Sequence, residues 1–154
     1  MALESLTAHA EATYSTLLYL LLSLRQLKEP PATLDTLSHV ASHLGIAQCI
    51  SVLLRAMPYH ASRGHLVIPV DIAAKHGLRQ EELFRSLKGG NPENIHGLQD
   101  AVYDFAVVAN DQLLAAKSMF EKEVPEESKR NSIPVFLQGV SHSYLYGFPL
   151  LIHP

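Results

Sequence analysis

The 154-residue chain has a composition suited to one packed domain. Of its residues 47% are hydrophobic, and its formal net charge is −3, so the chain can bury a substantial core. Its 12 Lys and Arg residues are spread along the sequence, whereas a nucleic-acid partner requires a clustered basic face. The single cysteine, Cys49, excludes an internal disulfide and a cysteine-rich zinc site, and its apolar neighbours indicate a buried thiol.

The N-terminal region carries no recognisable targeting or membrane signal. The stretch Met1–Glu4 contains an acid and no base, so it resembles neither a secretory signal nor an arginine-rich transit peptide. The most apolar run, Leu17 to Leu24, is shorter than the roughly 20 residues that span a bilayer. We expect this run to be a buried helix of a helical bundle.

The first half of the chain predicts two long helices. Residues 3–28 form an amphipathic candidate that ends before Pro30-Pro31. Thr33 is a suitable N-cap for a second helix, which we expect to end near Met57 because Pro58 disfavours helical backbone at the residue before it.

The second half predicts shorter elements and then another long helix. Residues 59–70 read as irregular, residues 71–77 as a short helix capped by Asp71 and ended by Gly77, and residues 80–88 as a further helix. Asn91-Pro92-Glu93 has the features of a helix start.

From there apolar residues recur at steps of three and four, which predicts one long helix with a buried stripe ended by Pro125. A last helix is expected over residues 126–140, bent near Pro134, and residues 141–154 read as an irregular apolar tail. No segment alternates like a strand, so the predicted fold class is all-α. The stripe consists of Ile95, Leu98, Val102, Phe105, Ala109, Leu113, Ala116 and Phe120.

One segment, residues 45–71, carries a specific motif. Its frame resembles the second substrate-binding segment of the squalene/phytoene synthase family, whose members join two allylic diphosphates. The variant Leu54-Arg-Ala-Met-Pro-Tyr-His60, with the downstream Tyr103-Asp-Phe-Ala106, is most similar to the branch of that family made up of mitochondrial complex I assembly factors. The matching frame positions are Gly45, Ala47, Leu54, Arg55, Arg63, Gly64, Pro69 and Asp71.

This resemblance implies a fold and a boundary. Residues 1–140 would form the C-terminal part of a squalene/phytoene-synthase-like domain, a partial isoprenoid-synthase-type helical bundle. Such a part would expose an apolar face that the rest of the domain normally covers. Exposed apolar faces mark interaction sites or aggregation liabilities, so we expect a partner or self-association at that face.

Active members of the family hold magnesium with an Asn and two Asp spaced four residues apart. Those three positions are Val52, Ala56 and His60 in this chain. Valine and alanine offer no ligand atom, and imidazole suits softer metals than magnesium, which prefers oxygen. The resemblance therefore implies a pseudoenzyme with no catalytic residue, no metal site and no cofactor.

The function implied is that of a non-catalytic helper in the assembly of mitochondrial respiratory complex I. It would act on the matrix side of the inner membrane by contacting assembly intermediates or other assembly factors. An isoprenoid or lipid in the cavity and peripheral membrane association are further expectations. Two alternatives stay open: a prenyl transferase on allylic diphosphates that needs magnesium, and an inactive truncated isoform.

Arg55 and Arg63 are the candidate ligand-binding residues. In the family these positions lie near the diphosphate pocket, and the planar guanidinium suits phosphate oxygens. An alternative is that Arg55 pairs with an acid and holds a helix break at Pro58.

Two other patterns have simpler explanations than metal binding. Asp100 and Asp104 spell D-x-x-x-D, but acids four residues apart are common on a solvated helix face. His39 and His43 lie one turn apart without a third ligand, so we expect a surface or half-buried pair.

Overall fold

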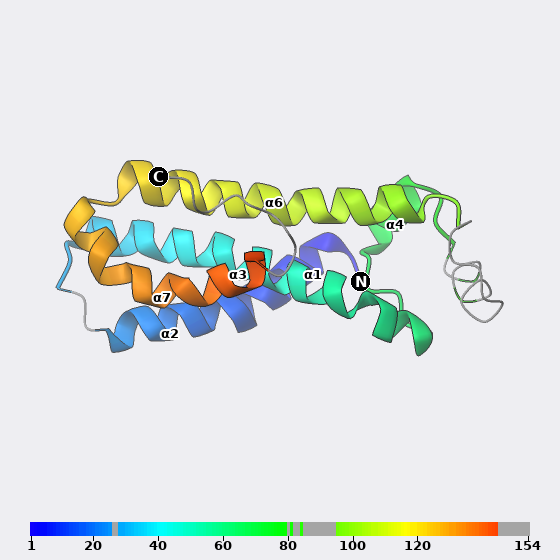
Figure 1. The fold of residues 1–154 in the computed structure, drawn as a ribbon, viewed down its shortest axis with the longest axis horizontal. Helices are drawn as coiled ribbons and strands as arrows, with labels where there is room; N and C mark the ends of the chain where they lie inside the picture. Colours follow the sequence, from blue (N-terminus) through cyan, green and yellow to red (C-terminus); the bar gives the residue numbers. More distant parts are fainter. Residues whose placement is uncertain (26–27, 80, 82–83, 85–94, 145–154) are drawn as a thin grey trace.

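The computed structural model describes residues 1–25, 28–79, 81, 84 and 95–144, and this part of the chain is an elongated bundle of helices (Figure 1). The described residues contain no strand, which confirms the predicted all-α class. The elements are α1 (Leu3–Ala10), η1 (Glu11–Ser15), α2 (Thr16–Leu24), α3 (Pro31–Ser62), α4 (Val70–Lys75), α6 (Leu98–Glu123) and α7 (Glu126–Tyr144).

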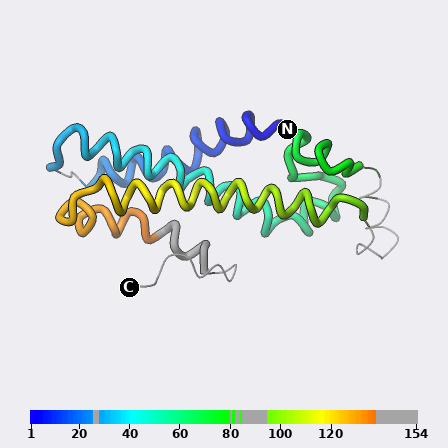
Figure 2. Tube along the Cα trace, turned by 90° about the horizontal axis from the view of Figure 1, so that it is seen from above, coloured from blue at the N-terminus to red at the C-terminus, as the bar shows by residue number. Residues whose placement is uncertain are grey.

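The long helices α3 and α6 lie side by side along the length of the molecule, and the shorter helices pack around them (Figure 1). Helices α2 and α7 lie toward one end, α1 lies near the middle and α4 lies toward the other end (Figure 1). The N-terminus lies beside α4 (Figure 2), where the Val70 amide donates to the Met1 carbonyl at 3.0 Å.

The helix predicted over residues 3–28 is continuous through α1, η1 and α2, but it ends at Leu24, earlier than predicted, and it contains a π-helical turn. The Thr16 amide bonds the Glu11 carbonyl five residues earlier, and the Thr16 hydroxyl donates to the same oxygen at 3.0 Å. The extra residue in this turn shifts the buried face of α2 relative to that of α1. Period-3.6 patterns do not reveal such an insertion.

Helix α3 begins three residues earlier than predicted, because its N-cap position is Pro30 and not Thr33. Pro31 occupies the first turn, where a missing amide proton is tolerated. Thr33 is not the cap: it lies inside the helix and is buried.

The predicted end of this helix near Met57 is wrong, because α3 continues through Pro58 to Ser62. Pro58 leaves the Leu54 carbonyl without its usual helical donor. The proline is exposed, so it lies on the side where water can reach the backbone. Met57 packs on the core and Ala61 is buried, so tertiary packing holds the last turn in place.

Helix α3 is long and apolar enough to cross a membrane by length and composition alone. Half of its most apolar window is buried inside the bundle. The central helix of a packed domain has the same properties.

The start of α6 differs from the prediction. Residues 91–94 lie outside the described part of the chain, as does most of the predicted helix 80–88, but residues 95–97 are not helical. Gly97 precedes the first turn of α6 with φ 74°. A Cβ at Gly97 would lie 2.1 Å from the His76 carbonyl oxygen, so a glycine is required where these two turns meet.

Helix α7 also runs further than predicted. It continues through Pro134, which is exposed, and ends at Tyr144. Residues 141–144 are therefore helical, and the remainder of the predicted tail, residues 145–154, lies outside the described residues.

All eight residues of the predicted stripe belong to one of two apolar clusters. Seven of them lie on α6, which confirms the buried face of this helix, whereas Ile95 precedes it. The first cluster joins α1, the middle of α3, α4 and the first half of α6 around Phe105, which is fully buried. The second joins α2, the first half of α3, the end of α6 and α7 around Leu37. The clusters divide the bundle into two halves along its length.

Candidate functional site

The three positions that the resemblance equates with magnesium ligands lie on α3, in the half of the bundle that contains the first apolar cluster. Val52, Ala56 and His60 are each partly buried. The His60 ring packs edge-on against Tyr59, with ring centroids 5.5 Å apart. This set offers one nitrogen and no oxygen ligand, so it does not fit magnesium. Within the described residues, no group of three His, Cys, Asp or Glu is placed to hold a metal ion.

The two candidate arginines are both exposed, and both lie toward the C-terminal end of α3. Arg63 follows the last turn of α3 and its guanidinium lies 4.5 Å from the centroid of the Tyr59 ring. Arg55 lies eight positions earlier, about 12 Å along the helix axis. Its charge acts on Tyr14, whose pKa is nevertheless raised, chiefly by burial.

Neither arginine forms an ion pair with a carboxylate in the part of the chain that the structure describes. The alternative explanation of Arg55, an acid pair at a helix break, is not supported there, because α3 is unbroken at Pro58.

Asp71 caps a different helix from the one predicted. Both of its carboxylate oxygens lie 3.1 Å from the Leu3 amide, so it caps the start of α1. Asp71 itself lies in the first turn of α4, and no side chain caps the N-terminus of α4. The N-terminus is thereby tied to α4.

Asp104 joins α6 to α4. Its carboxylate accepts from Lys75 Nζ at 2.5 Å and lies 2.8 Å from His76 Nε2. The Lys75 hydrogen bond, and then that of His76, hold the pKa of Asp104 below its ordinary value. Asp100 is exposed. These two aspartates therefore do not form a joint site.

The histidine pair of α3 is divided between two partners. His39 Nε2 lies 3.7 Å from the carboxylate of Asp35 on the exposed face. His43 Nδ1 lies 2.6 Å from the Gln112 amide oxygen of α6. His43 therefore ties α3 to α6.

Sequence reasoning missed a polar layer that separates the two apolar clusters. Glu11 accepts hydrogen bonds from the Tyr19 hydroxyl and, at 2.8 Å, from Ser42 Oγ. Ser15, which is completely buried, donates to the Ser42 carbonyl at 3.2 Å. At the same level of α6, the amide oxygen of Asn110 is buried without a partner among the described residues.

Gly45 explains why the layer forms there. A Cβ on Gly45 would lie 2.3 Å from Ser15 Oγ and 2.6 Å from the Ser15 nitrogen. The π-helical turn and α3 therefore touch backbone to backbone at this point. The one feature of the sequence that indicates the polar layer is Glu11, a charged residue that directly follows the buried Ala10 on an apolar helix.

Burial raises the pKa of Glu11, but hydrogen bonds from Tyr19, Ser42 and Ser15, together with the nearby His43, outweigh it and the pKa is lowered from 4.5. The ionised form therefore stabilises the fold. This contribution is complete above the unfolded pKa and is lost as pH falls through the lower folded pKa.

We expect Glu11→Gln to lower stability at pH 7 by about 1 to 3 kcal/mol, because a charged acceptor of two hydrogen bonds is lost. The difference in unfolding free energy between Glu11→Gln and the unchanged protein should narrow as the pH falls below 4.5. Thermal melts from pH 3 to 8 measure both effects. Glu4→Gln, on the exposed face of α1, is the matched control, and an equal loss there would contradict a specific role of Glu11.

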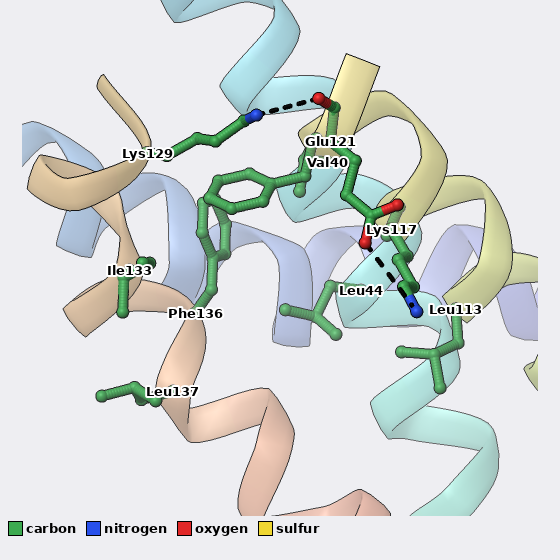
Figure 3. Close-up of a pocket in the computed structure, with 11 residues that line it drawn as sticks. Val40, Leu44, Leu113, Lys117, Glu121, Lys129, Ile133, Phe136 and Leu137 are labelled. Carbon is green, nitrogen blue, oxygen red and sulfur yellow. Dashed lines mark hydrogen bonds and ion pairs between the residues drawn. The ribbon is translucent and has the colours of Figure 1, made fainter. Parts of the chain in front are cut away.

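A groove of about 300 Å³ opens beside the second apolar cluster, between α3, α6 and α7 (Figure 3). Phe120 and Phe136 pack edge-to-face, with centroids 5.6 Å apart. The volume is at the lower end of the range for small-molecule sites. The lining residues are Val40, Leu44, Leu113, Ala116, Lys117, Phe120, Glu121, Lys129, Ile133, Phe136 and Leu137.

The charges of this groove are compensated. Lys129 Nζ donates to the Glu121 carbonyl at 2.8 Å and to the Glu126 carboxylate at 2.5 Å, and Lys117 lies 3.8 Å from Glu121. The amino-acid sequence does not indicate this groove, because the groove depends on how α7 packs against α6.

Comparison with known proteins places these features in a family. The sequence profile of the squalene/phytoene synthase family matches residues 2–139. The chain is 39% identical over 140 residues to the rat protein named NADH dehydrogenase (ubiquinone) complex I, assembly factor 6, and 40% identical over 139 residues to the human protein of that name. It is 32% identical over 140 residues to the Drosophila melanogaster homolog.

These alignments cover 90% to 91% of this chain but 37% of each relative, so the chain spans little more than a third of their length. No solved structure matches it. The family match covers nearly all of the all-α part described above. The chain belongs to the squalene/phytoene synthase family.

Proposed function

We propose that the protein is a non-catalytic helper in the assembly of respiratory complex I, acting in mitochondria on the matrix side of the inner membrane. The observation that carries this proposal concerns three positions on α3, where Val52, Ala56 and His60 offer no oxygen ligand for magnesium. The relatives' names, which refer to complex I assembly, support the process. The partners would be assembly intermediates or other assembly factors.

The chemistry of the family explains why these three positions of α3 matter. Ionising a diphosphate from a prenyl chain develops negative charge on the leaving group, and stabilising that charge is a large part of catalysis. The side chains at Val52 and Ala56 cannot bind a cation or the diphosphate. In this proposal the protein binds a ligand or a partner protein and does not convert it chemically.

The groove between α3, α6 and α7 would hold the apolar ligand of such a binding protein. Its walls are mainly aliphatic and aromatic, and its lysines are already paired with carboxylates. A neutral isoprenoid or lipid chain suits this lining better than a diphosphate. Mass spectrometry of organic extracts from the purified protein tests this ligand: a stoichiometric apolar compound supports it, and clean protein contradicts it.

The assembly role is tested by expressing the tagged chain in cells of its source and separating their mitochondria on native gels. We expect the tag to migrate with partly assembled complex I that contains its subunits. A tag found only as free protein, or outside mitochondria, would contradict the proposal. A tagged, unrelated matrix protein controls for non-specific migration.

One observation favours a second candidate, a prenyl transferase: Arg55 and Arg63 remain exposed without a carboxylate partner in the described part of the chain. This candidate needs magnesium ligands. The triple change Val52→Asn, Ala56→Asp and His60→Asp should create magnesium-dependent binding of an allylic diphosphate if the rest of the site survives. Calorimetry of the unchanged chain decides the matter, because magnesium-dependent binding without the triple change would favour the enzyme.

A further inference from the structure

The C-terminal half of α3 carries two exposed arginines and a tyrosine on one side. Arg55, Tyr59 and Arg63 follow one another at steps of four, so they lie on the same face of the helix. All three are exposed, and the exposed fraction of Tyr59 is 55%. We call these three residues the arginine face. The last turns of α3, which carry it, run away from α6 (Figure 1).

The chain does not neutralise the charge of the arginine face. The sequence contains no acid between Asp35 and Asp71. Within the residues that the structure describes, no carboxylate lies within ion-pair distance of Arg55 or Arg63. A binding partner therefore has to supply the negative charge.

The acids of the neighbouring helices are bound elsewhere. Asp71 of α4 accepts from a backbone amide of α1, and Asp104 of α6 pairs with α4. Glu11 of η1 accepts the hydrogen bonds of the polar layer. Glu4 of α1 and Asp100 of α6 are exposed and form no ion pair with α3 in the described part of the chain. The positive charge therefore belongs to the surface and not only to α3.

The arginine face is already ordered. The guanidinium of Arg63 lies 4.5 Å from the centroid of the Tyr59 ring, and the His60 ring packs edge-on against the same tyrosine. Side chains that are ordered in advance lose little freedom on binding, and Tyr and Arg are enriched among the residues that carry most of the binding energy of protein interfaces. Arg63 also complements the negative end of the helix dipole, whereas Arg55 lies two turns inside the helix and does not.

The exposure and the number of charges select the kind of anionic partner. A small anion on this face would stay largely in water, where charge pairs are weak. An anionic membrane surface is recognised by clusters of roughly four to eight Lys or Arg, whereas the arginine face has two, and nearby Lys75 is paired with Asp104. A protein surface can cover the tyrosine and shield both charge pairs from water at the same time.

We infer that the arginine face binds an acidic helix of a partner protein. Arg55 and Arg63 are eight positions apart, about 12 Å along the helix axis, so carboxylates two turns apart on a partner helix can meet both guanidiniums. The planar fork of arginine suits a carboxylate, and an apolar residue between the two acids would cover Tyr59. This inference rests on the proposed function, in which the partners are proteins.

Zero-length cross-linking tests for the carboxylate. A carbodiimide joins a lysine amine directly to an acid paired with it, so the tagged Arg63→Lys chain is treated in mitochondria of its source. Mass spectrometry then identifies both linked residues. We expect several-fold more intermolecular links at position 63, to Asp or Glu of one protein, than at Lys122, which is exposed on α6. No intermolecular link at position 63, or equal links at Lys122, would overturn the inference.

Charge reversal tests the pairing. Arg55→Glu with Arg63→Glu should weaken binding to the cross-linked protein at least tenfold, because like charges then face each other. Replacing the linked acids of that protein by arginine should restore most of the affinity. Lys122→Glu with Arg130→Glu, at exposed positions of α6 and α7, changes the net charge equally and should bind like the unchanged chain. Circular dichroism verifies the folds, and unchanged binding or a lack of restoration would overturn the inference.

The remaining outcomes separate this inference from the proposed function. Cross-links to a protein unconnected with complex I would support the acidic helix and contradict the proposed function. Comigration with complex I that survives both charge reversals would overturn the inference and leave the proposed function intact. Flotation with anionic phospholipid vesicles that requires both arginines, without a protein cross-link, would assign the face to a membrane and overturn the inference.

Discussion

Replacing Gly45 with alanine should destabilise the fold by about 3 kcal/mol, the upper part of the range for overpacked interiors. The added Cβ would lie 2.6 Å from the Ser15 nitrogen and 2.8 Å from its Cα. These are backbone atoms, so a side-chain rotation cannot relieve the clash, and η1 and α3 must move apart. The change would also disturb the hydrogen bond from Ser15 to the Ser42 carbonyl.

The sign of this effect makes it informative. In an exposed helix, alanine is about 1 kcal/mol more favourable than glycine, so intrinsic preference predicts the opposite result. Urea unfolding followed by circular dichroism measures the change. Ala32→Gly, at an exposed position of the same helix, should lose no more than about 1 kcal/mol. A Gly45→Ala protein as stable as the original would contradict the close approach of the two helices.

Phe105→Ala should cost about 3 to 5 kcal/mol of stability, the range for truncating a buried aromatic side chain. Phe105 is 0% exposed and lies in the first apolar cluster with Ile50 and Ile72. Its removal leaves a cavity where α3, α4 and α6 meet. Such a loss is a large part of the 5 to 15 kcal/mol that stabilises an ordinary domain.

Tyr103, two residues earlier on α6 and 69% exposed, provides the matched control. Tyr103→Ala should change the unfolding free energy by less than about 0.5 kcal/mol. Because Phe105→Ala can unfold the chain outright, Phe105→Leu gives a milder version with a smaller loss. Equal effects at the two positions would contradict the placement of Phe105 in the core.

Much of the fold was predictable because the apolar residues follow a helical period. The stripe from Leu98 to Phe120 identified the buried face of α6 correctly, and Ile95 is buried just before this helix begins. The helix ends were less predictable. Pro58 is a local signal for a helix end, but the packing of the residues after it outweighs that preference.

The family resemblance assigns Val52, Ala56 and His60 to the positions of the magnesium ligands, and the expected lack of a metal site remains a prediction. The polar layer could not be predicted. It depends on Glu11 and Ser42 meeting across 31 positions, and on a π-helical turn that leaves no periodic signal. The roles of Arg55 and Arg63 in ligand binding remain a prediction.

The central claim is that the protein serves complex I assembly without catalysis. Native gels of the respiratory complexes from cells in which its gene is disrupted test this claim most directly. The account predicts a selective loss of assembled complex I, with the other complexes intact, and recovery when the gene is restored. Normal complex I in the disrupted cells would contradict it.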